Sequence, residues 1–397
     1  MNLNFFTAEY PFRGSESYIE NEIPILGDNF SKIKIFPHFF EKENHRDIPK
    51  NAEICQLNES FNGEELSILY WLLIIKFFII ELFYARNKVY YLKNFGKWLS
   101  LLKIAAKKAV YIKNNNLLLN DAVCYSFWMN DWALVLVFLK EKKIIKDFVF
   151  RCGGFDIWDE RYEGNYLPFR GLVYKYTTKV FPNTLLGEEY IKERTSFPKK
   201  IAHKYFGTKD FGIGRFNDED PFTIVSISNV IPLKRVELII EILKHVKIPY
   251  RWIHFGDGPE MDNVKLKAKK YLNANQYSFA GRLPNFSDVL KCYSEYTVNL
   301  FISTSSTEGL PVTIQESISF GVPIIATNVG GVSEIVNETT GYLIDKNFDP
   351  KEVAKLIEEF SVSEFNSLKK RERIRTFWKQ NFEATEVYSR FCVTLKR

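Results

Sequence analysis

Apolar residues recur along the chain in short runs that are separated by turn residues and by segments with helical spacing. The runs Asn2–Ala8, Phe222–Ile227 and Val298–Ser303 are rich in apolar residues, which is typical of strands in a buried parallel sheet. Helix-like segments follow them, with apolar residues three and four positions apart. This alternation of strands and helices predicts an α/β fold.

One stretch, Glu64–Lys113, departs from that alternation. It begins with Leu66–Phe83, LSILYWLLIIKFFIIELF, an apolar run of 18 residues that carries Lys76 and Glu81. The run is near the lower length for a membrane-spanning helix, and central charges are costly there. Three interpretations remain open: a buried helix, a helix lying in the interface plane of an anionic membrane, and an ordinary helical hairpin with a solvated basic face.

The charge of the chain is concentrated in the same region. The net charge is only +6, but Leu82–Lys113 contains no acidic residue and eight basic ones, with aromatic residues between them. Such a surface would suit nucleic acid, but no nucleic-acid motif accompanies it. We therefore predict no nucleic-acid partner and an anionic membrane surface as the partner of this region.

Length and cysteine content narrow the class of protein. A chain of 397 residues is long enough for two domains with their own cores. The five cysteines are scattered and form no C-x-x-C, which indicates reduced thiols in a cytosolic protein, without a disulfide framework or a zinc site. The first residues, MNLNFFTAEYP, lack the regions of a signal peptide and predict a buried strand.

Two glutamates in the run LFISTSSTEGLPVTIQESISFGVPIIATNVGGVSEI are candidates for ligand binding. Glu308 follows the predicted strand Val298–Ser303, and Glu316 lies in a helix expected to begin near Pro311–Thr313. Ligands of α/β sheets bind outside the carboxyl ends of the strands, often at a helix N-terminus. Carboxylates there accept hydrogen bonds from sugar hydroxyls, while free amides after Glu308 face an anion. For an isolated E-x7-E, the usual explanation is that the first glutamate supports a helix N-terminus and the second is a solvated helix residue.

The wider context favours the functional interpretation. The run that begins at Glu308 closely resembles the donor-site signature of retaining glycosyltransferases of family 4, which have the GT-B fold of two Rossmann-like lobes. The resemblance implies that Glu308 contacts the transferred sugar and Glu316 holds the ribose hydroxyls. Other residues of this run are then donor-binding candidates: Gly309, Leu310, Pro311, Gly330 and Gly331.

A second segment of the same family precedes this run. SNVIPLKRVELII resembles the family pattern Ser-Asn-x-x-Pro-x-Lys-Arg before a helix. It implies that Lys234 reaches the donor diphosphate, with Arg235 beside it and Ser228 and Asn229 in the same loop. Two basic residues at a helix start oppose the helix dipole, which favours an anionic ligand.

Two further segments supply donor-binding candidates. YSFAGR resembles a family strand that borders the nucleobase, and so implies Gly281 and Arg282 as neighbours of the base. YPFRGSESYIENEI resembles the N-terminal segment of polysaccharide and lipopolysaccharide glycosyltransferases, in which a small residue approaches the donor phosphate. Gly14 and Ser15 are the candidates there.

The acceptor-side candidates come from two segments of the first lobe. DAVCYSFWMN resembles a family segment that feeds the acceptor pocket, which implies Tyr125, Ser126 and Trp128 as lining residues, with core packing as the alternative for the aromatics. FVFRCGGFDIWDE matches the family pattern Arg-x-His-Gly-x-Asp at Arg151 and Asp156. Asp156 is a catalytic candidate and Arg151 an acceptor-side candidate, and for both a polar role in the cleft and a buried ion pair are equal alternatives.

The same segment also departs from the family. Gly153 stands where the family usually has a histidine near the reacting centre. Glycine has no side chain that donates or accepts, so the contribution of that histidine is missing or comes from another group.

The resemblance implies a GT-B architecture with a helical insertion. We expect a first, acceptor-side lobe over 1–210 with the insertion at about 60–115, and a nucleotide-sugar donor lobe over 221–380. Residues 381–397 are expected to form a helix that crosses back to the first lobe.

The implied activity is that of a retaining, hexosyltransferase-type glycosyltransferase. It moves a sugar from a nucleoside diphosphate sugar, UDP- or GDP-linked, to a saccharide or lipid-linked oligosaccharide in cell-surface polysaccharide or lipopolysaccharide synthesis. No cofactor and no metal are expected, and the protein is expected at the cytoplasmic face of the membrane. The alternatives are a catalytically silent binding or regulatory subunit, which Gly153 motivates, and a sugar-nucleotide epimerase.

Overall fold

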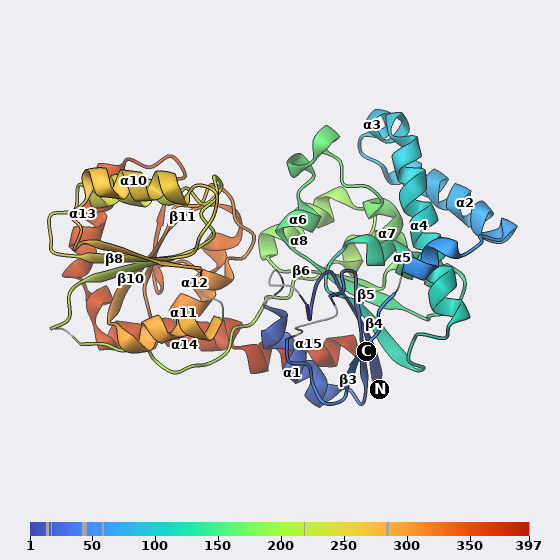
Figure 1. The fold of residues 1–397 in the computed structure, drawn as a ribbon, viewed down its shortest axis with the longest axis horizontal. Helices are drawn as coiled ribbons and strands as arrows, with labels where there is room; N and C mark the ends of the chain where they lie inside the picture. Colours follow the sequence, from blue (N-terminus) through green and yellow to red (C-terminus); the bar gives the residue numbers. More distant parts are fainter. Residues whose placement is uncertain are drawn as a thin grey trace. The chain divides into compact units, whose positions relative to one another are not determined.

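The computed structural model describes residues 1–12, 16, 18–41, 46–57, 59–217, 219–282 and 286–396, without the side chains of 286–289. It divides the chain into two compact units. Unit 1 consists of Met1–Tyr205 and Val387–Arg397, and unit 2 of Phe206–Glu386. Each unit is described by itself below, and Figure 1 shows their elements.

Unit 1 is built on a six-stranded parallel sheet with the strand order β3-β2-β1-β4-β5-β6. Its strands are β1 (Asn2–Thr7), β2 (Ile33–Pro37), β3 (Ala52–Ile54), β4 (Ala122–Ser126), β5 (Phe148–Cys152) and β6 (Lys179–Pro182). Its helices are α1 (Ile19–Asn29), α2 (Ile68–Tyr84), α3 (Lys88–Lys93), α4 (Phe95–Asn114), α5 (Asp131–Glu141), α6 (Gly154–Ile157), α7 (Arg170–Tyr176) and α8 (Leu185–Arg194). Single 3-10 turns are η2 (Glu59–Gly63), η3 (Asp159–Arg161), η4 (Glu163–Asn165) and η5 (Pro198–Lys200).

Unit 2 repeats this topology with the strand order β12-β11-β10-β7-β8-β9, again parallel. Its strands are β7 (Thr223–Ile227), β8 (Arg251–Phe255), β9 (Tyr277–Gly281), β10 (Val298–Ser303), β11 (Ile324–Thr327) and β12 (Gly341–Ile344). Its helices are α9 (Val236–Leu243), α10 (Met261–Tyr271), α11 (Phe286–Glu295), α12 (Val312–Ser319), α13 (Pro350–Ser361) and α14 (Leu368–Phe382), with 3-10 turns η6 (Gly330–Glu334) and η7 (Glu364–Asn366). The helix α15 (Ala384–Leu395) starts in unit 2 and belongs to unit 1 from Val387 onward.

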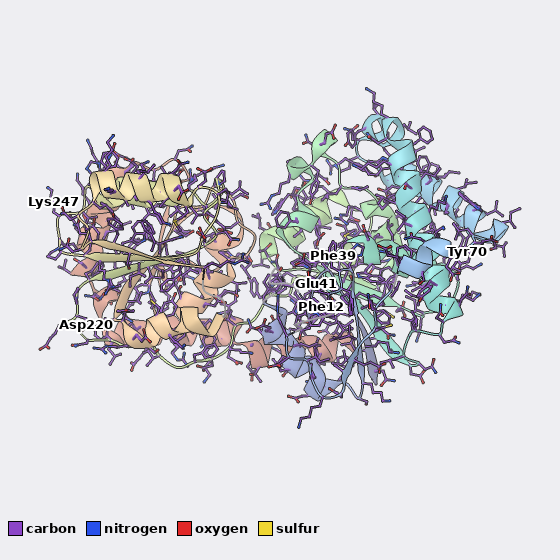
Figure 2. The ribbon with its side chains drawn as sticks, in the orientation of Figure 1. Phe12, Phe39, Glu41, Tyr70, Asp220 and Lys247 are labelled. Carbon is purple, nitrogen blue, oxygen red and sulfur yellow. The ribbon has the colours of Figure 1, made fainter. Side chains whose placement is uncertain are left out.

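Both sheets are doubly wound, as the sequence predicted, and the two-lobe α/β fold is confirmed. In each sheet the first strand of the unit lies beside the fourth, so that the order of the chain reverses between β1 and β4 and between β7 and β10. Helices cover both faces: Figure 1 shows α10 on one face of the second sheet and α11 and α14 on the other. Side chains fill the layers between sheets and helices (Figure 2). Ligands of such sheets bind outside the carboxyl ends of the strands where the order reverses.

Local sequence explains where several helices begin. The side chain of Asn130 accepts a hydrogen bond from the amide of Trp132 at the start of α5, and Thr184 accepts one from the amide of Gly187 in α8. Asp349 does the same for α13, whose first residue is Pro350. Such caps satisfy helix amides that have no partner within the helix.

One boundary in unit 1 differs from what the sequence predicts. The spacing from Phe181 to Glu193 predicts a helix after a short strand, but Phe181 lies in β6, where it pairs with Arg151 of β5. The apolar side chain is buried in the sheet, which overrides a helical spacing that begins there. The sequence also predicts a helix from about Ser15 to Leu26. Ser15 lies outside the described residues, and the described helix α1 begins at Ile19.

Candidate functional site

The loops that follow β7 and β10 meet at the reversal point of the second sheet. Lys234 lies in the loop after β7, and its Nζ donates a hydrogen bond to Oε1 of Glu308, in the loop after β10, over 2.6 Å. The lysine side chain is 27% exposed and that of Glu308 10%. A lysine and a glutamate that are 74 positions apart therefore form one charged pair at the position where the fold binds ligands.

A glycine turn packs against this pair. The amide of Gly331 donates to the carbonyl of Gly309 over 2.8 Å. Gly330 has a φ of +55°, and a Cβ there would lie 2.1 Å from the carbonyl oxygen of Glu308. Only glycine fits this close backbone approach. The structure thus brings together the two donor-binding runs that the sequence singled out at 308–311 and 330–331.

Glu316 lies within α12, the helix that follows Glu308 and Pro311. It is only 6% exposed, and burial raises the pKa of its carboxyl group well above the usual value. Among the described residues no hydrogen bond or ion pair reaches this carboxylate. Leu310 and Pro311 are buried beside the helix start. A buried carboxylate without a donor is costly, and a ligand with hydroxyl donors would relieve that cost.

Arg235 is engaged within the protein. Its backbone has a φ of 49°, and its guanidinium donates from Nε to the carbonyl of Thr304 over 2.7 Å and from Nη2 to that of Ser305 over 3.3 Å. The hydroxyl of Thr304 in turn donates to the carbonyl of Arg235 over 2.9 Å. The resemblance implied that Arg235 lies beside Lys234 at the donor diphosphate. In the structure, its hydrogen bonds join the loops after β7 and β10.

A small cavity opens where these loops meet. It encloses about 210 Å³, part of which is open to solvent. Its lining residues are Ser226, Ile227, Ser228, Lys234, Val236, Ile239, Ile302, Ser303, Thr304 and Ser305. Of the loop candidates, Ser228 is on its wall, while Asn229 is exposed.

Gly281 and Arg282 lie farther away. They follow β9, the edge strand, and β8 separates that strand from β7. Gly281 has a φ of +70° and Arg282 is exposed. The amide of Gly256 donates to the carbonyl of Gly281 over 2.9 Å, so the two strand ends are joined. Their predicted place beside a nucleobase stays a prediction.

The acceptor-side aromatic candidates of unit 1 pack into the protein. Tyr125 is fully buried and its hydroxyl donates to Glu22 over 3.0 Å. Ser126 is fully buried too, and its hydroxyl donates to the carbonyl of Trp128 over 2.6 Å. The indole nitrogen of Trp128 donates to Glu16 over 2.7 Å. Tyr125 and Ser126 therefore do not line an open pocket here, whereas Trp128 is half-buried.

Arg151 and Asp156 take part in separate ion pairs. Arg151 is fully buried, with its Nε 3.7 Å from Glu22. Asp156 lies 3.5 Å from Arg170 and accepts a hydrogen bond from the amide of Met129 over 3.2 Å. Burial raises the pKa of Asp156, and the charge of Arg170 opposes that shift. The geometry is that of the buried-ion-pair alternative.

A side chain at Gly153 would meet its neighbours closely. A Cβ there would lie 3.0 Å from Cζ3 of Trp128 and 3.3 Å from Nδ2 of Asn183. Asn183 is 5% exposed, and its Oδ1 has no hydrogen-bond partner among the described residues. A larger residue here would therefore require the indole or the amide to shift by a few tenths of an ångström.

Glu16 is a residue that the sequence analysis missed. Its carboxylate is buried and accepts hydrogen bonds from the amides of Ala8, Glu9 and Tyr10, over 3.2, 2.6 and 2.6 Å. It therefore satisfies the amides of the loop after β1, where the sequence expected an anionic ligand near Gly14 and Ser15. Those two residues are outside the described part of the chain. The sequence signal that could have identified Glu16 was an acidic residue at the end of a strand-to-helix loop.

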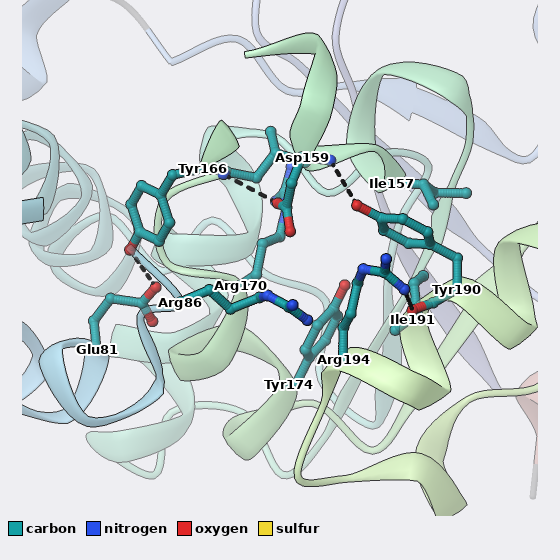
Figure 3. A pocket seen from close by; sticks show the side chains of 11 residues that line it. Glu81, Arg86, Ile157, Asp159, Tyr166, Arg170, Tyr174, Tyr190, Ile191 and Arg194 are labelled. Carbon is teal, nitrogen blue, oxygen red and sulfur yellow. Dashed lines mark hydrogen bonds between the residues drawn. The ribbon is translucent and has the colours of Figure 1, made fainter. Parts of the chain in front are cut away.

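A larger cavity in unit 1 was also missed. It encloses about 430 Å³ including the space open to solvent. Its lining residues are Glu81, Arg86, Ile157, Asp159, Tyr166, Leu167, Arg170, Tyr174, Tyr190, Ile191 and Arg194. Figure 3 shows the guanidinium groups of Arg86 and Arg194 pointing into it, with the ring of Tyr174 between them. These residues come from distant segments, so sequence spacing could not have grouped them.

Several polar groups of this cavity bind one another. The hydroxyl of Tyr166 donates to Glu81 over 2.6 Å, and that of Tyr190 accepts from the amide of Asp159 over 3.1 Å (Figure 3). Glu81 also accepts from the amide of Leu172 over 2.8 Å. Burial raises the pKa of Glu81 to about 7. The mixture of arginines, tyrosine hydroxyls and carboxylates suits a ligand rich in hydroxyl groups.

Comparisons with known proteins agree with this geometry. The family model described as glycosyl transferases group 1 matches residues 212–380. A putative colanic acid biosynthesis glycosyltransferase, WcaL of Salmonella typhimurium, is 23% identical over 229 residues, which are 54% of this chain and 55% of that protein. N-acetyl-alpha-D-glucosaminyl L-malate synthase of Bacillus anthracis is 26% identical over 159 residues, or 39% of each chain. The chain thus spans about half or less of the length of these relatives.

Solved structures match over the whole chain. Anabaena Alr3699/HepE in complex with UDP superposes with a TM-score of 0.70 at 14% identity, covering 100% of both chains. The lipopolysaccharide outer core galactosyltransferase WaaB gives a TM-score of 0.68 at 14% identity, also covering 100% of both chains. At such identity these likenesses establish the fold. The chain therefore has the GT-B fold, and its residues 212–380 match the glycosyl transferases group 1.

Proposed function

We propose that this chain is a glycosyltransferase that moves a sugar from a nucleoside diphosphate sugar to a saccharide or lipid-linked acceptor. The observation that carries the proposal is the meeting of Lys234 and Glu308 at the reversal point of the second sheet, with the buried carboxylate of Glu316 on the helix that follows Glu308. The match of residues 212–380 to glycosyl transferases supports it. So does the bound UDP of the HepE structure, which shares the fold.

Each group has a task in this reaction. The ammonium group of Lys234 stabilises the negative charge that develops on the leaving diphosphate. The first amides of α12, which have no partner within the helix, stabilise the same charge. Glu316 accepts hydrogen bonds from the ribose hydroxyls. Glu308 holds the transferred sugar, so that the acceptor hydroxyl meets an oriented anomeric carbon.

The finer points of the proposal follow the resemblance to family 4. The anomeric configuration is retained, the donor is UDP- or GDP-linked, and the product enters surface polysaccharide or lipopolysaccharide. Lys234 and the first amides of α12 take the place of a metal, so transfer should proceed at an unchanged rate in a chelator such as EDTA. A rate that falls with EDTA and returns with Mg²⁺ or Mn²⁺ would contradict this point. NMR of the product anomer tests retention.

We further propose that the acceptor binds in the cavity of unit 1 around Arg86, Tyr174 and Arg194. Arg86→Ala should raise the KM for the acceptor several-fold and leave donor binding unchanged, because the side chain is exposed and lies in the other unit from Lys234. An unchanged acceptor KM would remove this cavity from the proposal.

The first experiment is a panel of nucleotide sugars tested by thermal shift, followed by release of nucleoside diphosphate with and without candidate acceptors. Wild type is compared with Lys234→Ala and Glu316→Ala. A true donor stabilises the folded state with the logarithm of its concentration over its Kd. A selective shift that both variants lose, with release that rises on adding acceptor, supports the proposal.

Gly153 favours one second candidate, a silent GT-B subunit that binds donor without transferring sugar. Gly153 has no side chain that could donate or accept a proton, and Trp128 and Asn183 lie close beside it. A donor-induced shift without release of diphosphate, under any acceptor, would favour this candidate.

A further inference from the structure

One exposed stripe of α2 is apolar, and Lys76 is an exposed charged residue of the same helix. The helix buries one stripe, Tyr70, Ile74, Phe77 and Glu81, against unit 1. The opposite stripe, which we call the outer stripe, consists of Ile68, Leu72, Ile75, Ile79 and Phe83, and these side chains are 48–76% exposed. A surface helix ordinarily carries polar residues on that face, and a continuous exposed apolar patch marks an interaction site.

The apolar surface continues onto neighbouring helices. Val89 and Leu92 of α3 and Phe95 and Ile104 of α4 are 38–66% exposed. Helices α2, α3 and α4 lie together on one side of unit 1 (Figure 1), and Tyr70 marks α2 in Figure 2. The outer stripe is therefore part of a wider apolar surface that several helices share.

Basic side chains lie near the exposed part of α2. The Nζ of Lys103 on α4 lies 5.7 Å from the ring centre of Trp71, an exposed residue of α2 next to Leu72 in the sequence. Lys97 and Lys103 are exposed. Lysine stems can cover apolar surface while their charged ends reach outward.

The acidic residues near this surface are mostly engaged elsewhere. Glu81 is buried with Tyr166 and Leu172. Glu141 pairs with Lys76, and Glu64 accepts from Asn114. Glu59 and Glu65 are exposed near the start of α2. No acidic residue lies between Leu82 and Lys113, and Lys97 and Lys103 of α4 are exposed there.

We infer that the outer stripe and its lysines bind the surface of a bilayer that contains anionic phospholipids, with α2 lying in the interface plane. Across the described residues, no helix is long and apolar enough to cross a membrane. An apolar face flanked by lysines fits the acyl boundary and the anionic headgroups together, whereas a protein partner would not need both. This binding goes beyond sugar transfer, and it can be measured without turnover.

The test is co-sedimentation of the full chain with vesicles of phosphatidylcholine alone and of phosphatidylcholine mixed with phosphatidylglycerol. Wild type should bind the anionic vesicles, and less at about 0.5 M than at about 0.05 M salt, because salt screens the lysines. Ile75→Glu/Ile79→Glu should lower the partition coefficient at least about tenfold. Lys97→Glu/Lys103→Glu should lower it on anionic vesicles and weaken the salt dependence.

Matched controls come from unit 2. Leu266 on α10 is 69% exposed, so Leu266→Glu should bind vesicles like wild type, as should Lys265→Glu/Lys269→Glu on the same helix. Melting temperatures and circular dichroism check that each variant is folded. A second measurement of binding, quenching of tryptophan fluorescence by brominated lipid, can be made on wild type without a disruptive substitution. Trp71→Phe should remove most of the quenching.

Three results would overturn the inference. The first is that wild type stays in the supernatant with anionic vesicles at low salt. The second is that the Ile75→Glu/Ile79→Glu variant binds as well as wild type. The third is that sedimentation velocity shows a dimer that this variant dissociates, without vesicle binding, in which case the surface joins two copies of the chain. None of these results depends on sugar transfer, so a failure of this inference would leave the proposed function untouched.

Discussion

Glu308 and Glu316 are eight positions apart in the sequence, yet their surroundings differ in kind. Glu308 pairs with Lys234 over 2.6 Å, whereas Glu316 is buried without a hydrogen bond or ion pair among the described residues. Carboxylates held in such different environments serve different tasks. Glu308 balances the charge of Lys234 in the free protein. The buried carboxylate of Glu316 can accept hydrogen bonds from a ligand.

The Lys234–Glu308 pair leads to a prediction with opposite signs for binding and turnover. Glu308→Gln should raise the affinity for free nucleoside diphosphate roughly fivefold, about 1 kcal/mol, because the lysine no longer has a competing carboxylate. The same change should lower kcat about a hundredfold, since the sugar loses a positioned group. Calorimetric titration and steady-state kinetics measure the two effects. A loss of diphosphate affinity would show that the pair does not compete with the ligand.

The buried carboxyl of Glu316 predicts a pH effect on stability. Burial raises its pKa in the folded state well above the ordinary value of a glutamate, so its contribution to stability is present below that ordinary value and is lost as the pH rises through the folded pKa. Glu316→Gln removes this loss. Between about pH 5 and about pH 8 the melting temperature of the variant should fall less than that of wild type.

Two further outcomes separate this effect from damage to the fold. Glu316→Gln should not lower the melting temperature of the free protein at about pH 8, because it replaces a costly buried charge by a neutral amide. It should lose most of the shift that the donor induces. Equal pH slopes in the two proteins would mean that Glu316 is solvated and charged.

At the scale of elements, Arg151 explains how the end of the chain is held in unit 1. Its guanidinium lies 4.0 Å from the ring centre of Phe391 on α15. It also donates to the carbonyls of Lys204 and Tyr205, each over 3.1 Å. One buried side chain thus contacts both segments of unit 1 at which the chain passes to or from unit 2.

Removal of Arg151 should therefore destabilise unit 1 strongly. Arg151→Met leaves Glu22, which is fully buried, without its positive neighbour, and should cost about 3–5 kcal/mol of unfolding free energy. The cost should shrink at acidic pH, since burial already raises the pKa of Glu22. Chemical denaturation measures both. Arg194→Met is the control and should cost less than about 1 kcal/mol, because Arg194 is partly exposed.

At the scale of the whole molecule, the two sheets form two cores, and the candidate donor groups belong to the second one. Hydrogen exchange with and without UDP should show the largest protection in three segments of unit 2, 228–236, 304–316 and 330–334. Ligand binding slows local opening where the ligand contacts the chain. Protection that is largest in unit 1 would place the nucleotide elsewhere.

Much of the donor side could be predicted from the sequence because it is local. The strand Val298–Ser303 was predicted with the bounds of β10, and Glu308, Gly309 and the glycines 330–331 do lie together. Short motifs carry this information since each loop directly follows its own strand. Arg235 is the exception, because its partners lie about 70 positions away, beyond the reach of a motif.

The acceptor side could not be predicted in the same way. Tyr125, Ser126 and Arg151 looked like lining residues, but packing buries them, while the open cavity gathers residues from α2, α7, α8 and the turns between them. Whether an aromatic residue lines a pocket or fills a core depends on what packs against it. A single sequence contains no such contacts.

By itself, the sequence determined the parallel α/β fold and which loops carry the donor candidates, because apolar periodicity and strand-to-helix loops act over short distances. Only the tertiary structure decided which charged side chains bind partners inside the protein, as Arg235 and Arg151 do. It also decided which carboxylate is buried without a partner among the described residues, as for Glu316. It also decided that one face of α2 remains exposed. Burial and pairing arise from contacts between distant segments, so they exist only once the chain has folded.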